Sequence, residues 1–147
     1  MGREVLGNRR GVALVIALII LLILTFIGIS AISTTTFETN ITGNERVATD
    51  AFYASEAILQ MGLNQLPNIG PIALRSIGDD SRGWSGSPRD KGSPRSALSF
   101  GGYPKAGYDS SWAFNRYQLN GTGESFGAKK EIEAQVSYGP FPAGTQY

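Results

Sequence analysis

The sequence predicts an α+β fold, in which a long helix in the N-terminal part is followed by a small antiparallel sheet. Residues 12–32 form a charge-free apolar stretch, and in residues 37–66 apolar side chains recur near the helical period. Residues 111–119 and 131–138 alternate apolar and polar side chains, which is the pattern of half-buried strands. One face of that sheet is expected to cover the apolar stripe of the helix.

The apolar stretch reads VALVIALIILLILTFIGISAI, and no charge follows it until Glu38. A helix rises about 1.5 Å per residue, so about 20 residues cross the roughly 30 Å hydrocarbon core of a bilayer. The stretch is therefore long enough to span a membrane, and it exceeds the 7–15 apolar residues typical of a cleaved secretory signal. Arg3, Arg9 and Arg10 precede it, which favours a cytoplasmic N-terminus.

The amphipathic segment is expected to continue the helix to Leu66, because Pro67 disfavours the helical conformation of the residue before it. Its buried stripe is predicted to contain Phe37, Ile41, Ala48, Phe52, Ile58, Leu59, Leu63 and Leu66. Thr42 and Glu45 have the spacing of a capping box around Gly43, so a second helix starting there is the alternative.

Between helix and sheet, residues 68–108 lose periodicity and are rich in Gly and Pro, which predicts a long surface loop. Residues 120–130, reading NGTGESFGAKK, are predicted to connect the two strands as a loose hairpin loop. A third strand is expected at 98–100 or 103–108. Four cations in the long loop, Arg82, Arg89, Lys91 and Arg95, outweigh Asp90 and leave an acidic partner open.

Composition argues against several function classes. The chain has no His and no Cys, which excludes histidine-based triads, thiol catalysis and His or Cys metal ligands. The net charge of +1, without a basic patch among aromatics, predicts no nucleic-acid binding. Glu131 and Glu133 share one strand face and are interpreted as a solvated surface. We therefore expect no enzyme activity, no catalytic residues, no metal and no cofactor.

The junction Arg9-Arg10-Gly11 followed directly by an apolar helix is similar to the class III signal sequence of type IV prepilins. The stretch from Arg9 to Leu59 resembles the N-terminal region of PilX-type minor pilins. The shared features are the RGVAL start, the LLILT step, the threonine cluster 34–36, the Gly43-Asn44 pair and a Tyr53-x-x-Glu56-Ala57 segment.

The resemblance implies a pilin-like lollipop fold and processing of the N-terminus. It implies that a prepilin peptidase cuts off a basic leader, residues 1–11, between Gly11 and Val12, and that the new N-terminus at Val12 is methylated. Residues 12–36 form the transmembrane and assembly helix, and residues 37–147 the periplasmic globular domain. The protein is anchored in the inner membrane and then enters the pilus, with other pilins and minor pilins as partners.

One position departs from the family pattern. Most pilins carry a glutamate five residues into the mature chain, where this sequence has Ile16. Because an unpaired carboxylate in lipid is costly, it persists only where it has a use. Its absence implies a minor pilin that primes or caps the filament. The alternatives are a minor pseudopilin of type II secretion, of the GspK type, or a plain single-span envelope protein whose periplasmic domain binds a ligand.

Overall fold

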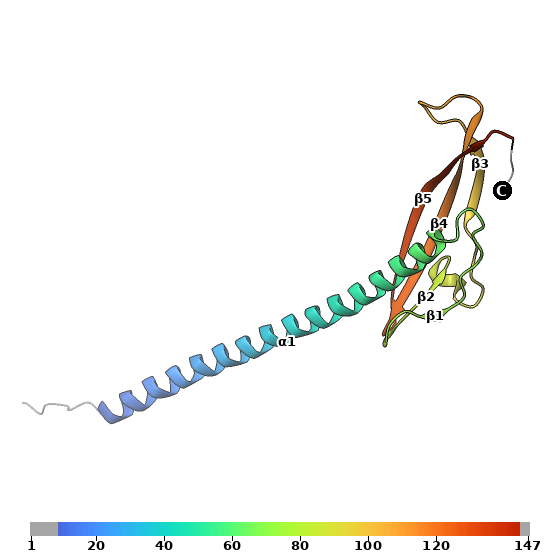
Figure 1. Cartoon of the computed structure of the whole chain (residues 1–147). Coiled ribbons are helices and arrows are strands. Elements are labelled where there is room, and N and C mark those ends of the chain that lie inside the picture. Colours follow the sequence, from blue (N-terminus) through green and yellow to red (C-terminus); the bar gives the residue numbers. More distant parts are fainter. Residues whose placement is uncertain (1–8, 145–147) are drawn as a thin grey trace, which may run out of the picture. The chain divides into compact units, whose positions relative to one another are not determined.

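The computed structural model describes residues 9–144, so residues 1–8 of the predicted leader lie outside the described part. One helix is followed by five strands and a short 3-10 helix (Figure 1). Their bounds are α1 Arg9–Leu63, β1 Arg75–Ser76, β2 Ser81–Ser85, η1 Pro88–Asp90, β3 Leu98–Tyr103, β4 Trp112–Ser125 and β5 Ala128–Pro142. The predicted α+β class is confirmed. By its internal contacts the chain divides after Gly43 into two units.

Helix α1 runs through Gly43 without interruption, so the alternative of a second helix starting at Thr42 is wrong. The Thr42 hydroxyl donates to the carbonyl oxygen of Glu38 at 2.9 Å, which is a bond inside a helix and not a cap. The helix ends at Leu63, three residues before the predicted end. The amide N–H groups of Gln65 and Leu66 then bond three residues back, which closes the last turn tightly.

The sheet is organised around β4. Strand β5 pairs with β4 from Ala128 to Pro142, while β2 and β3 pair with its other edge one after the other. All of these pairings are antiparallel, and β1 extends the sheet beyond β2. The third strand predicted at 98–100 is confirmed as β3, which extends to Tyr103.

Two loop predictions are wrong. The segment predicted as the 120–130 connector belongs largely to the sheet, because β4 continues to Ser125 and β5 begins at Ala128. Only Phe126 and Gly127 form the turn between them. The stretch 68–108 contains β1, β2, η1 and β3 rather than one continuous loop. Short strands with glycine and serine carry too weak an alternation to be recognised as strands.

Mostly small residues, together with the predicted Ile58, form the buried face of the helix in the unit after Gly43. Buried there are Ala51, Ala54, Ser55, Ile58 and Gly62. Of the predicted stripe, Ile58 is buried, whereas Phe37, Ile41 and Phe52 are exposed. The stripe prediction is therefore wrong for these three residues and confirmed for Ile58, while Ala48, Leu59, Leu63 and Leu66 are half-buried.

The glycines of β4 explain this choice of small residues. A methyl group added at Gly121 would lie 2.7 Å from the carbonyl oxygen of Ser55, and one at Gly123 would overlap the carbonyl oxygen of Ala51. Helix and strand therefore meet backbone against backbone, which only residues without a side chain permit on the strand. The pattern Asn-Gly-Thr-Gly serves close packing here and not a turn.

The opposite face of β4 is covered by the segment 86–95. Trp84 is fully buried beneath it, and its indole N–H donates to the carbonyl oxygen of Ser87 at 2.9 Å. Thr122 is also fully buried and donates to the carbonyl oxygen of Gly86 at 2.6 Å. The sheet is thus packed on both faces at this end.

Candidate functional site

The largest apolar surface of the described chain lies on α1 before Gly43. Its large side chains are 50–70% exposed from Val12 to Ile32, among them Leu21 at 64% and Phe26 at 65%. An 18-residue window of this helix has a mean hydropathy of 3.3 and none of it is buried in the structure. By length and composition the helix can cross a bilayer, and it fits a single-span membrane anchor.

Several threonine hydroxyl groups on this helix donate to backbone carbonyl oxygens of the same helix. The side chains of Thr34, Thr35 and Thr36 donate to the carbonyl oxygens four residues earlier at 2.9–3.0 Å, and Thr25 does the same at 2.7 Å. A hydroxyl that is already bonded costs much less to move out of water than an unpaired one. The threonine cluster therefore extends the surface that tolerates an apolar environment beyond Ile32.

The predicted processing site lies at the start of α1. Arg9 and Arg10 are its first two residues, and Gly11 and Val12 follow in the first turn. Glycine has about 1 kcal/mol lower helix propensity than alanine, so Gly11 weakens this first turn.

Ile16 lies one turn further along the same helix, with its side chain 53% exposed. From Val12 to Phe37 the sequence contains no carboxylate, so the helix surface offers no acidic group to a neighbouring amine. The sequence-predicted site residues thus fall on one continuous helical segment.

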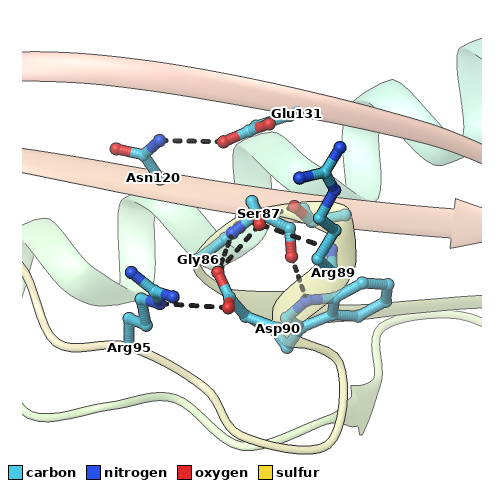
Figure 2. Close-up of polar contacts among 9 residues, drawn as sticks. Gly86, Ser87, Arg89, Asp90, Arg95, Asn120 and Glu131 are labelled. Atoms are coloured by element: carbon cyan, nitrogen blue, oxygen red, sulfur yellow. Dashed lines mark hydrogen bonds and ion pairs between the residues drawn. The ribbon is translucent and has the colours of Figure 1, made fainter.

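A second feature is a pocket of about 320 Å³ on the face of the sheet opposite the helix. One wall is the turn around η1, the other is formed by Arg95 to Leu98, and the floor is formed by Gln118 and Asn120 of β4. Figure 2 shows this region, with Asn120 donating to Glu131 at 2.8 Å across to β5.

A capping box holds the η1 turn rigid. The backbone N–H and the hydroxyl of Ser87 donate to the carboxylate of Asp90 at 2.9 and 2.8 Å, and Arg95 bonds the other carboxylate oxygen at 3.0 Å (Figure 2). The Ser87 bonds, aided by the charge of Arg95, hold the pKa of Asp90 below its ordinary value. Asp90 is therefore an ionised structural acceptor at neutral pH.

The cations of the long loop do not form a free basic patch. Lys91 and Arg82 contact the carboxylate of Glu124 at 2.7 and 3.5 Å. Lys91 also lies 5.8 Å from the Trp84 ring. The hydrogen bond and charge of Lys91, with the charge of Arg82, lower the pKa of Glu124 although burial opposes them. Since Arg95 is paired with Asp90, three of the four cations already have partners.

The described residues give little support for metal chemistry. Between residues 9 and 144 no three carboxylates lie close enough together to hold a metal ion. Glu131 is engaged by Asn120 across the strand pair, in keeping with a surface carboxylate.

The geometry defines a class: an α+β protein with one exposed apolar helix and a small sheet domain. Residues 10–60 match a family model described as PilX N-terminal. Residues 10–60 thus form a PilX-type N-terminal region of type IV pilins, as the resemblance predicted. Comparison with curated proteins gave no match, and comparison with solved structures gave none either.

Proposed function

We propose that this protein is a minor pilin of a type IV pilus, with a structural and not a catalytic role. The observation that carries the proposal is the family match, which begins at Arg10 and so includes the junction between Gly11 and the charge-free helix. The leader stays in the cytoplasm, the helix crosses the inner membrane, and the sheet domain faces the periplasm.

Assembly then exchanges one apolar environment for another. The helix leaves the bilayer and packs against the N-terminal helices of other pilins, where van der Waals packing and not a hydrophobic gain holds the helices together. Two observations support this exchange. The side chains from Val12 to Ile32 are apolar and exposed, and the threonine hydroxyls donate to backbone carbonyl oxygens, so neither group needs water as a hydrogen-bond partner.

Processing by a prepilin peptidase tests the proposal directly. A C-terminally tagged full-length chain is expressed with and without the peptidase, and the mature N-terminus is determined by mass spectrometry. We expect loss of residues 1–11 and a methylated Val12. Gly11→Val should block the cut, whereas Gly28→Ala, a change inside the span, should leave it unchanged. A chain that keeps its leader beside the active peptidase would contradict the minor-pilin proposal.

The missing glutamate supports a priming or capping role over that of a repeating subunit. A repeating subunit needs a partner for the terminal amine of each neighbour, and Ile16 cannot supply one. Ile16→Glu should leave membrane insertion intact but change the amount of protein found in sheared filaments. Ile19→Glu, a matched carboxylate three residues further along, serves as the control. Equal incorporation of Ile16→Glu and wild type would remove the support for priming.

Two other functions are distinguishable from this one. A type II secretion pseudopilin would be cut in the same way, but its deletion would block secretion and leave pili intact. A plain single-span envelope protein would not be cut, and the pocket beside η1 would then be the place to look for its ligand.

A further inference from the structure

The turn between β4 and β5 places a bulky apolar residue in a backbone conformation that such residues rarely adopt. Phe126 has φ 43° and Gly127 has φ 88°, the combination of a two-residue turn that normally carries Asn-Gly or Asp-Gly. Among the described residues Phe126 is the only non-glycine with positive φ. A strained conformation at a bulky residue costs free energy and therefore calls for a reason other than the turn itself.

The side chain of Phe126 gains little from its own domain. It is 73% exposed, more than any other large apolar side chain in the described part of the chain. Asparagine would fit the turn better and expose no apolar area. The structure thus presents an aromatic ring to solvent on a rigid two-residue turn, which is the form of an interface anchor.

The register of the packed helix locates this ring. Leu119 of β4 lies over Gly62, Gly121 over Ser55, and Gly123 over Ala51, so β4 runs antiparallel to the helix. The two strand residues beyond Gly123 advance about 7 Å, which corresponds to about five helical residues. Phe126, the next residue, is therefore near the level of Arg46, close to the start of the unit that begins at Asn44.

We propose that Phe126 docks on the apolar N-terminal helix of a neighbouring pilin-type subunit. The inference rests on the proposed function, since it requires assembly with such subunits. The chemistry of the occupant is that of residues 12–37 of this chain: a charge-free helix surface that needs an apolar cover once it has left lipid.

The surface of α1 shows that a helix of this kind can accept an aromatic ring. A shallow hollow of about 410 Å³ lies on α1 within this range, lined by Val15, Leu18, Ile19, Leu21, Leu22 and Thr25. Such an apolar depression is large enough to accept a phenyl ring. The ring of this chain would then meet a similar apolar surface on the N-terminal helix of the neighbouring subunit.

Photocrosslinking in a pilus-producing bacterium tests the docking. Phe126 is replaced by p-benzoylphenylalanine in the full chain, and Phe100, which is 58% exposed on β3, is the matched control position. After irradiation of intact cells, the adduct at position 126 should map by mass spectrometry to the apolar N-terminal helix of a pilin subunit. An adduct only on a periplasmic domain, or none above the control, would overturn the proposal.

A substitution separates docking from folding. Phe126→Asn should leave the unfolding midpoint unchanged or raise it, because Asn-Gly suits the turn, yet incorporation into filaments should fall about ten-fold, as for a truncated interface anchor. Phe100→Asn should incorporate like wild type. Undiminished incorporation of Phe126→Asn overturns the docking proposal alone, provided that the leader is cut in the same cells. An uncut leader overturns the proposed function, and the docking proposal with it.

Discussion

The two halves of α1 are built from different residues because they meet different neighbours. Before Gly43 the helix carries large apolar side chains that are exposed, such as Leu21 and Phe26. After Gly43 it buries small ones, such as Ala51 and Ala54, against the glycines of β4. The comparison teaches that large apolar side chains mark the exposed half of the helix, whereas small residues mark the half that packs on the sheet.

The largest expected effect concerns the packed region. Trp84→Ala removes a fully buried side chain and should lower the free energy of unfolding by about 3–5 kcal/mol. Calorimetry on the detergent-solubilised full chain measures the shift of the unfolding midpoint. Trp112→Ala, at a position 42% exposed, should cost much less. Equal losses would mean that the segment 86–95 does not form the cover over the sheet described above.

The close approach of helix and strand gives the next largest effect. Gly123→Ala should destabilise the sheet domain by about 1–3 kcal/mol, because the added methyl group forces the helix backbone away. At Gly92 the same methyl group would meet nothing within 4 Å, so Gly92→Ala is the control. If Gly123→Ala leaves the stability of the sheet domain unchanged, the small residues of the helix are not held against β4.

Acid should weaken the packed region through Glu124. Its pKa is lower in the folded chain than the ordinary value of about 4.3, so its stabilisation is fully present above that pH. That stabilisation is lost as the pH falls through the lower, folded pKa. The unfolding midpoint measured from pH 7 down to pH 3 should fall, and Glu124→Gln should make the decline shallower. Parallel curves for both proteins would remove Glu124 as the cause.

The smallest effect is expected in the exposed half of the helix. Leu21→Ala removes an apolar side chain that is 64% exposed in the unit before Gly43, so the unfolding midpoint of the sheet domain should stay the same. The variant should also remain in the membrane fraction, since one alanine changes the span little. A lowered midpoint would show that the two halves are not energetically independent.

Much of the helix could be predicted from sequence because its signals are strong. A charge-free run, a basic leader and Pro67 predict an anchor and its approximate end without knowledge of packing. The buried face could not be predicted in this way. Periodicity favours Phe52, whereas the glycines across the interface select Ala51 and Ser55, and that selection depends on a strand far along the chain.

The errors in the sheet have the same origin. Asn120-Gly121 reads as a turn signal when taken alone, since glycine serves both turns and close approach. The real turn, Phe126-Gly127, carries no asparagine and was hidden inside the predicted connector. The strain of this turn is visible only in its backbone angles. In the sequence, the glycine of the Phe-Gly pair is the one signal that favours a turn at this place.

The threonine bonds have a consequence for how deeply the anchor sits. Because Thr34, Thr35 and Thr36 already donate to backbone carbonyls, their hydroxyl groups can enter hydrocarbon without losing a hydrogen bond. The first residue that resists entry is Glu38. Five residues correspond to about 7 Å along a helix. An anchor of this kind has no fixed depth, and it can adapt to bilayers of different thickness by sliding instead of tilting.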